Sequence, residues 1–299
     1  MSKRVIIVFL GMLMLLASSS VFAFEKEETF LPLGGHITYG SYSNSNQRES
    51  IISETMNCSY LINSSSIPVF NSNLDFKLCQ SNLTRKFPLS KIKGISSSLT
   101  YSCLEQLKTT DYLGARISAT YIKSDDKNSN NTLIPYGSLI YKSSDFSKYL
   151  DFGYSRTAYK DTTIDQITLT GGTALFNWRT WLQTRLYYIS LNKKVQEKDR
   201  VLAIEERFTY YAIPQRLSLA FYGMLGKRIY AYDPDLEAAY NLSDIQKGSG
   251  GLSATYNLTK ALSMFGDITY EAYENKDISN DYSVTLPNFR DEICLLIKI

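Results

Sequence analysis

The sequence has few of the residues that build metal centres and disulfide frameworks. Its 299 residues include four cysteines and one histidine, and no two cysteines form a Cys-x-x-Cys pair. A structural zinc site needs a close set of such ligands, and disulfide-dense secreted domains carry many more cysteines for their length. We therefore expect no metal and no cofactor, and at most one disulfide among Cys58, Cys79 and Cys103.

The chain also lacks an excess of charge of one sign. It has 32 Lys and Arg residues against 29 Asp and Glu residues, a net charge of +3, and no basic block stands out along it. Proteins that bind nucleic acid usually carry a basic patch or stripe. We expect no nucleic-acid partner.

Long apolar runs are missing beyond the start of the chain. There, Lys3 and Arg4 precede the stretch VIIVFLGMLMLLA, and small residues follow it up to Ala23. This pattern predicts a signal peptide over residues 1–23 that is cleaved on export. The stretch is shorter than the roughly 20 residues of a membrane-spanning helix, so we expect residues 24–299 to be exported without a helical anchor.

Tyrosine, by contrast, is abundant. The chain has 23 Tyr residues against 14 Phe and 2 Trp. A tyrosine ring is apolar and its hydroxyl is polar, so the residue suits a boundary between membrane and water. Soluble β-rich proteins also use tyrosine, so its abundance alone does not separate the two classes.

The exported region alternates apolar and polar residues in segments of about ten residues, which is the pattern of half-buried strands. We predict strands near residues 35–43, 51–62, 68–80, 92–103, 110–123, 132–142, 147–158, 163–176, 179–191, 201–213, 216–227, 249–258, 261–272 and 289–299.

The predicted connections alternate in length. LFNWR, AIPQR and YNLTKA are tight turns, whereas NKKVQEKDR, residues 228–248 and ENKDISNDYSVTLPN are longer and polar. Short turns on the periplasmic side and long loops outside are typical of outer-membrane barrels. The pattern predicts an all-β, closed antiparallel transmembrane barrel of about 12–14 strands in a Gram-negative outer membrane.

A soluble secreted β-sandwich is the main structural alternative, because its strands alternate as well. In LSMFGDITYEAYE, the apolar face holds Met264, Ile268 and Tyr270, and the other face holds Asp267 and Glu271. Similar strands place Gly and Ala on the apolar face, which fill a sandwich core poorly but are acceptable toward lipid. This favours the barrel, with Met264, Ile268 and Tyr270 facing lipid.

Charged residues of the opposite parity are then expected to face the lumen. The predicted lumen-facing residues are Arg116, Arg179, Arg185, Glu205, Arg207, Asp267, Glu271, Arg290, Glu292 and Lys298. Two arrangements remain open. The charges line a water-filled channel of weak ion selectivity, or they pair across the lumen and fill it, which leaves a structural barrel whose outer loops contact the ligand.

His36, the single histidine, is a weak candidate for a catalytic base. Lipid-modifying barrel hydrolases, such as phospholipases and lipid A deacylases, use a Ser–His pair. No serine with an orienting group is marked near His36. We expect a non-enzymatic protein and keep a lipid-modifying enzyme centred on His36 as the alternative. Acidic pairs such as Asp233 and Asp235 read as solvated loop residues.

The second half of the chain resembles a known family. The stretch LDFGYSRTAYKDTTIDQITLTGGTALFNWRTWLQTRLYYISL and the later GGLSATYNLTKALSMFGDITYEAY are similar to YaiO-type outer-membrane β-barrels. The resemblance implies a porin-like barrel in contact with outer-membrane lipid and lipopolysaccharide, without an assigned reaction. Such barrels also occur beside tetratricopeptide modules in polysaccharide secretion proteins, and this sequence shows no such helical repeat. Polysaccharide or small solutes are the partners that this context implies.

The last strand, FRDEICLLIKI, is expected to be read by the barrel insertion machinery. It places alternate apolar residues on one face up to Ile299. It ends in Ile, where Phe or Trp is usual for this signal.

Overall fold

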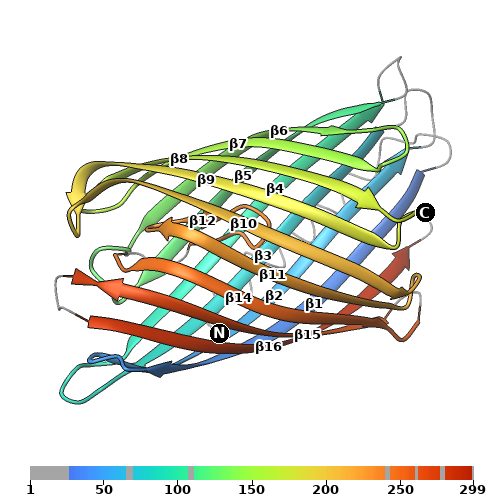
Figure 1. The fold of residues 1–299 in the computed structure, drawn as a ribbon. Helices are drawn as coiled ribbons and strands as arrows, with labels where there is room; N and C mark the ends of the chain where they lie inside the picture. The colour runs from blue at the N-terminus through green and yellow to red at the C-terminus, as the bar shows by residue number, and fades with distance from the viewer. Residues whose placement is uncertain are drawn as a thin grey trace.

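Fourteen long strands form one closed antiparallel barrel in the computed structural model (Figure 1). The structure describes residues 27–64, 70–106, 111–239, 243–259, 262–276 and 280–297, and the predicted signal peptide lies outside them. The barrel strands are β1 (Glu27–Ser43), β2 (Arg48–Ser64), β3 (Phe70–Arg85), β4 (Ile92–Gln106), β5 (Tyr112–Ser124), β6 (Thr132–Lys142), β7 (Lys148–Ala158), β8 (Thr163–Leu175), β9 (Thr180–Val195), β10 (Lys198–Ile213), β11 (Leu217–Arg228), β14 (Ile245–Asn257), β15 (Leu262–Asn275) and β16 (Asn280–Ile297).

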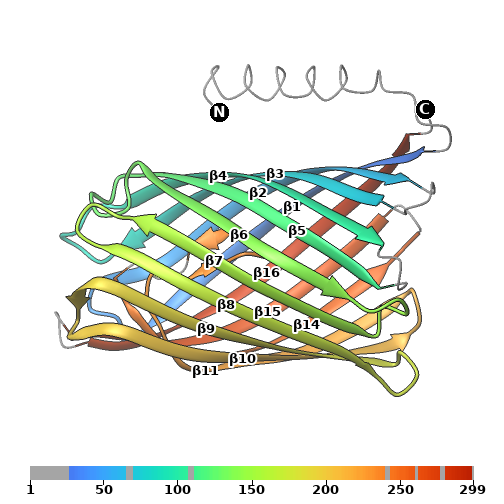
Figure 2. The ribbon, with the colours of Figure 1, turned by 90° about the horizontal axis from the view of Figure 1, so that it is seen from above.

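The barrel closes because its first and last strands pair. β1 and β16 run antiparallel, with Leu33 opposite Ile293 and Ser41 opposite Thr285. Every other barrel strand pairs with its neighbours in the chain, and Figure 2 shows their strong inclination to the barrel axis. Closure leaves no unpaired strand edge, as a strand-built membrane protein requires. The predicted fold class is confirmed.

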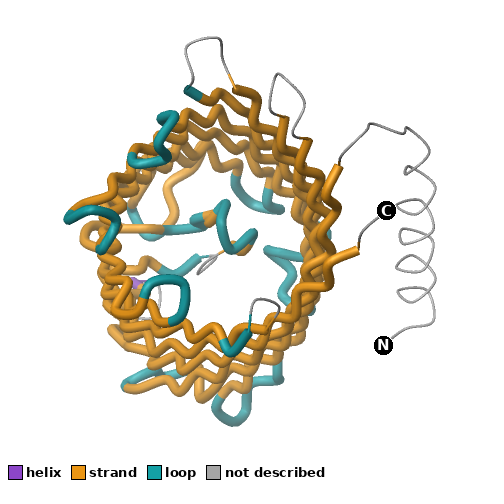
Figure 3. Tube along the Cα trace, turned by 90° about the vertical axis from the view of Figure 1, so that its right-hand side faces the viewer, coloured by secondary structure: helices purple, strands orange, loops and turns teal. Residues whose placement is uncertain are grey.

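Apolar side chains cover the outside of this barrel and polar ones line the inside. On β5, Ile117 is 62% exposed and Leu113 is 49% exposed, whereas the intervening side of the strand buries Ser118 and Thr120. Figure 3 looks along the barrel and shows the ring that the strands form. A sandwich buries its apolar faces between two sheets, so the sandwich alternative is wrong.

Two of the predicted long loops are in fact strand. β9 extends to Val195 and β10 begins at Lys198, so only Gln196 and Glu197 join them. Both turn residues have positive φ (49° and 65°), as a tight type I′ hairpin requires. Likewise, β15 extends to Asn275 and β16 begins at Asn280. The polar residues there belong to strand ends, which alternate less clearly than the middle of a strand.

The two ends of the barrel differ. The end that carries the β8–β9 turn (176–179) and the β10–β11 turn (214–216) is called the turn end here, and β1 begins and β16 ends there. The β8–β9 turn exposes Phe176 and Trp178. The opposite end, called the loop end, carries the β9–β10 turn and the longest connection, which joins β11 to β14 across residues 229–244.

Candidate functional site: a segment folded into the barrel

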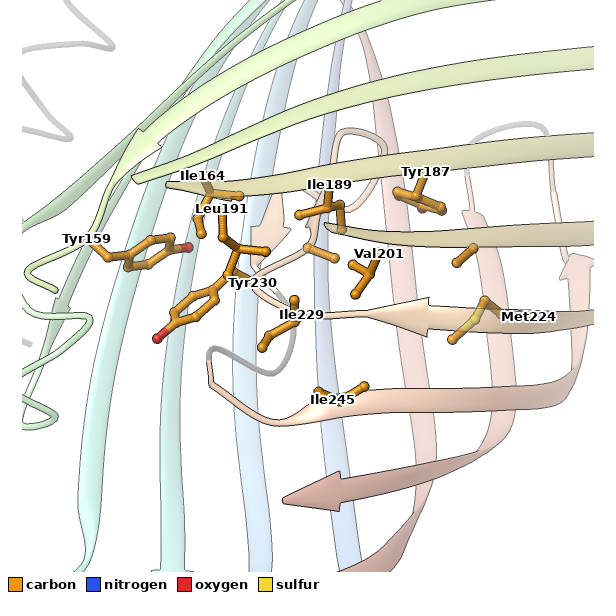
Figure 4. Close-up of a cluster of buried hydrophobic side chains, with 12 residues drawn as sticks. Tyr159, Ile164, Tyr187, Ile189, Leu191, Val201, Met224, Ile229, Tyr230 and Ile245 are labelled. Carbon is orange, nitrogen blue, oxygen red and sulfur yellow. The ribbon is translucent and has the colours of Figure 1, made fainter. Parts of the chain in front are cut away.

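The connection between β11 and β14 does not project from the barrel; it enters the barrel. Its first residues, Ile229, Tyr230 and Ala231, are buried among inward side chains of the neighbouring wall (Figure 4). The wall side of this cluster comprises Tyr159, Ile164, Tyr187, Ile189, Leu191, Val201, Ala203, Met224 and Ile245. Burial of apolar area holds the start of the segment in place.

A short hairpin follows inside the barrel. Its two strands are β12 (Tyr232–Asp233) and β13 (Ala238–Ala239), and Figure 1 shows β12 within the ring of barrel strands. Asp233 accepts hydrogen bonds from the backbone N–H groups of Asp235 and Leu236, at 2.8 and 3.1 Å. Such an aspartate-centred turn is locally favoured. We call residues 232–239 the inner hairpin.

Two arginines of the barrel wall hold the acidic tip of the inner hairpin. Arg185 on β9 pairs with Asp233 at 3.3 Å and also with Asp235. Arg116 on β5 pairs with Asp235 at 3.0 Å and with Asp151 on β7 at 3.5 Å. The Arg185 side chain is only 4% exposed. Asp235 thus joins two strands that lie four positions apart around the barrel.

The hairpin also reaches the wall formed by β3, β4 and β5. Glu237 accepts hydrogen bonds from the hydroxyls of Ser98 and Thr100, and Lys77 donates to the carbonyl of Leu236. The Tyr232 hydroxyl lies 3.1 and 3.2 Å from the hydroxyls of Ser118 and Thr120. The inner hairpin therefore crosses the lumen.

The amide of Gln166 fixes the hairpin backbone at β8. Its Nε2 donates to the carbonyl of Tyr232 at 2.6 Å, and its Oε1 accepts from the Tyr232 N–H at 2.9 Å. Gln166 is 1% exposed. A buried side chain that satisfies both backbone groups of one residue makes this contact sensitive to substitution.

The root of the segment is tied down at the loop end. Asp244 pairs with Arg48 and accepts hydrogen bonds from Tyr282 and from Asn275, the latter at 2.6 Å. Lys276, which follows Asn275 in the chain, donates a hydrogen bond to the Glu197 carboxyl group at 2.6 Å and lowers the pKa of that group. This contact joins the β9–β10 turn to the residue that follows β15. It stabilises the loop end of the barrel close to Asp244, where the inner segment returns to the wall.

The other predicted lumen charges form local contacts on the inner face. Glu205 pairs with Arg228 at 3.0 Å. The Arg207 guanidinium lies 5.2 Å from the centre of the Tyr222 ring. The Tyr222 hydroxyl donates a hydrogen bond to Asp267, and the Tyr273 hydroxyl donates one to Glu271.

The structure places some predicted residues elsewhere. Arg179 is exposed in the β8–β9 turn and does not face the lumen, because β8 ends before it and β9 begins after it. Arg290 and Glu292 are strand residues of β16 whose side chains lie outside the described part of the chain, and Lys298 lies outside it entirely.

His36 lies on the inward face of β1, partly buried. Its cross-strand neighbours are Thr55 on β2 and Arg290 on β16, so the adjacent strands place no serine directly beside it. Cys58, Cys79 and Cys103 are free thiols. Among the described residues, no group of three or more His, Cys, Asp or Glu side chains is arranged to hold a metal ion.

The sequence pattern does not predict that the central acidic residues of the site lie inside the barrel. The sequence pattern predicts solvated loop residues at Asp233 and Asp235, yet Asp233 is 5% exposed and both residues bind wall arginines. The available signal was the run IYAY at 229–232, which is too apolar for an exposed loop. Such a run next to two aspartates predicts a segment that packs on something.

The wall opposite the buried cluster has a different character. On β1 to β4 the inward positions include small uncharged polar residues, such as Thr38, Ser53, Thr55, Asn57, Ser81 and Ser96, and also the charged residues Asp75 and Lys77 of β3. The lumen is therefore apolar and charged near β5 to β11, and on β1 to β4 it is rich in hydroxyl and amide groups around the charged residues Asp75 and Lys77.

No model of a known protein family matches the sequence, and no curated protein matches it. Solved structures share its fold at low identity. An outer membrane channel from Pseudomonas putida F1 is 12% identical, with 91% of this chain and 97% of that chain covered and a TM-score of 0.53. A Pseudomonas aeruginosa FadL homologue is 10% identical, with coverages of 92% and 91% and a TM-score of 0.55.

A bacterial polysaccharide outer membrane secretin is 8% identical, with 90% of this chain and 98% of that chain covered and a TM-score of 0.50. At these identities the similarity establishes the fold. The chain has the closed β-barrel fold of bacterial outer-membrane channels.

Proposed function

We propose that the protein is a non-enzymatic outer-membrane channel in which the inner hairpin forms a fixed constriction beside a water-filled passage. One observation carries this proposal. Asp235 lies inside the barrel and is held by Arg116 and Arg185, yet its side chain is 46% exposed. Leu236, next to it, is 47% exposed. A filled lumen would bury both residues.

The contacts of the inner segment support a fixed constriction. The segment is held by the buried cluster at its start, by ion pairs at its tip and by Asp244 at its root. Opening would break all three sets of contacts at once and would leave the largely buried Arg185 without a carboxylate partner, which is costly. The hairpin thus acts as a permanent part of the wall.

The polar wall of β1 to β4 supports the chemistry of the cargo. Hydroxyl and amide groups offer both donors and acceptors without a net charge. Such a lining suits small polar solutes and neutral saccharides, and the mixed charges of the hairpin region favour weak ion selectivity. We therefore propose polar solutes or polysaccharide as cargo and a relation to YaiO-type barrels.

The exposed apolar outer face supports the membrane location. A soluble protein rarely exposes such a continuous apolar surface, and here it surrounds the barrel through residues such as Ile117, Leu139 and Leu225. The start of β1 and the end of β16 then lie on the periplasmic side, at the turn end, and residues 1–23 are removed as the signal peptide. The outer face meets outer-membrane lipid and lipopolysaccharide.

Thiol modification tests the passage beside the hairpin. In a variant with all four native cysteines replaced by Ser, Leu236→Cys places a thiol at the tip of the inner hairpin. A bulky charged methanethiosulfonate reagent is expected to lower the single-channel current in planar bilayers. The matched control is Leu258→Cys, which is 43% exposed in the turn after β14. Equal currents before and after modification of Leu236→Cys would contradict the proposal.

The enzyme alternative is tested separately. Neither the unmodified protein nor His36→Ala is expected to turn over phospholipid or lipid A. Lipid turnover by the unmodified protein that His36→Ala abolishes would establish the alternative in place of the channel.

A further inference from the structure

The ladder between β6 and β7 stops before either strand ends. Its last rung toward the loop end joins Tyr136 to Ser155. Beyond this rung, β6 retains residues 132–135 and β7 retains residues 156–158. Each of these segments still pairs on its other side, β6 with β5 and β7 with β8. The two strands therefore separate from each other while both remain part of the barrel wall.

The gap between the two strands is closed again at its far border. The N–H of Lys160 donates a hydrogen bond to the carbonyl of Asn128 at 3.4 Å, so the β5–β6 and β7–β8 connections meet beyond the gap. Two strand ends that only fray would not meet again. Pro135, the first residue past the last rung, has no N–H to donate, and prolines in strands mark places where a ladder is interrupted. We call the gap between residues 132–135 and 156–158 the side window.

Apolar residues border the side window on the outer face of the barrel. Leu133 is 54% exposed, and Pro135 and Ala158 are exposed as well. In lipid, backbone polar groups need partners within the protein, and a complete ladder normally supplies them. In the proposed membrane, an uncovered window near the loop end would join the lumen to the outer leaflet. The wall therefore needs a cover at this place.

The side chain of Tyr232 crosses the inner side of the window. Gln166 on β8 holds the Tyr232 backbone, and the Tyr232 hydroxyl lies 3.1 Å from the hydroxyl of Ser118 on β5. Between these two strands lie β7 and β6, so the side chain passes over the last rung and its surroundings. The Tyr232 ring centre lies 5.6 Å from that of Tyr136, and the ring packs with Ile134 in one buried cluster.

A second ring of the inner segment covers the border of the window at β7. The ring centre of Tyr230 lies 4.7 Å from that of Tyr159, the residue that follows β7. Two inward residues at the gap are accordingly buried, since Ile134 is 1% exposed and Thr157 is 4% exposed. The two tyrosine rings thus lie where the rungs of the ladder are missing.

We propose that Tyr230 and Tyr232 form a shutter that closes the side window and separates the lumen from the outer leaflet. The inner segment then has a second role besides the constriction, because it completes a part of the wall that the strand ladder leaves open. The inference rests on the proposed membrane location of the protein and does not depend on the conduction of solutes.

Thiol labelling from the membrane phase tests the shutter. In the full-length protein with all four native cysteines replaced by Ser, Thr157→Cys places a thiol at the side window. The matched control is Thr120→Cys, which lies 3.2 Å from the Tyr232 hydroxyl but on β5, whose ladders are complete there on both sides. Tyr230→Ala combined with Tyr232→Ala is expected to raise the labelling rate of Thr157→Cys by the lipid-soluble N-pyrenyl maleimide several-fold more than that of the control. An equal rise at both positions, or no rise, in folded and inserted protein would overturn the shutter.

A cross-strand pair tests the window while both tyrosines stay in place. Leu133→Cys with Ala158→Cys places two outward thiols across the window, and Leu139→Cys with Phe152→Cys is the matched pair in the regular ladder. Mild oxidation is expected to give several-fold more intramolecular disulfide in the ladder pair than in the window pair. Equal yields would overturn the window. A barrel that inserts but carries no current would overturn the proposed channel alone, and recovery of the unmodified protein in the soluble periplasm would overturn the membrane location.

Discussion

The charged residues inside the barrel are arranged as ion pairs and charge-assisted hydrogen bonds. Arg185 and Asp233 have side-chain exposures of 4% and 7%, and Glu205 pairs with the largely buried Arg228. A charge that is removed from water is tolerated when a partner of opposite sign is close, and the loss of one partner leaves the other uncompensated. The inner segment therefore depends on its arginines more than on any exposed ion pair.

We predict that Arg185→Leu lowers the free energy of unfolding by about 3–5 kcal/mol, because Asp233 is left buried without its cation. The control is Arg156→Leu, which removes an exposed arginine 3.8 Å from Asp165. Its effect is expected to be about 1 kcal/mol or less. Urea titration of the folded protein in lipid vesicles measures both. Equal losses for the two variants would contradict the role of the buried pair.

Asp235→Asn is predicted to shift ion selectivity toward anions. The substitution keeps the size of the side chain but removes the negative charge between Arg116 and Arg185, beside the proposed passage. The reversal potential across a salt gradient in planar bilayers reports this shift. Asp125→Asn changes an exposed acidic residue after β5, outside the barrel, and should leave the reversal potential unchanged. A shift of the same size in both variants would speak against a location in the passage.

At the scale of elements, the strands were predictable and the inner hairpin was not. All fourteen predicted strands correspond to barrel strands, because alternation such as that of Leu113 to Tyr121 is a local signal. The inner hairpin depends on contacts between residues far apart in the chain, such as Asp235 with Arg116. A polar turn has the same sequence pattern whether it is surrounded by water or contacts an arginine of the barrel wall.

The assignment of faces on β15 gives a direct test. Ile268 is 50% exposed on the outer face, and the neighbouring Asp267 lies on the inner face with Tyr222. Ile268→Arg is predicted to reduce insertion into the membrane, since an outward arginine costs about 2–4 kcal/mol near the bilayer centre. Asp267→Leu should insert normally. The heat-modifiable fraction on a gel measures insertion, and equal insertion of both variants would show that the faces are assigned wrongly.

At the scale of the whole molecule, the inner wall of the barrel has one side that the inner segment covers and another side that is polar. The inner segment packs through apolar contacts against β8 to β11 and, by way of Tyr232, against β5 and β6, and it reaches β3 and β4 through polar contacts. The hydroxyl-rich wall of β1 to β4 stays free of that apolar packing among the described residues. This asymmetry places the proposed passage beside the hairpin tip, where Asp235 and Leu236 are exposed.

Replacement of the inner hairpin tests the central claim most directly. A variant in which residues 232–239 are replaced by a short Gly-Ser linker removes the constriction and keeps the fourteen barrel strands. The matched control replaces residues 125–131, the connection between β5 and β6 at the same end of the barrel. Single-channel recording in planar bilayers is predicted to show a larger conductance step for the hairpin variant than for the unmodified protein and the control. An unchanged step, or the absence of steps in all three, would contradict a channel constricted by the inner hairpin.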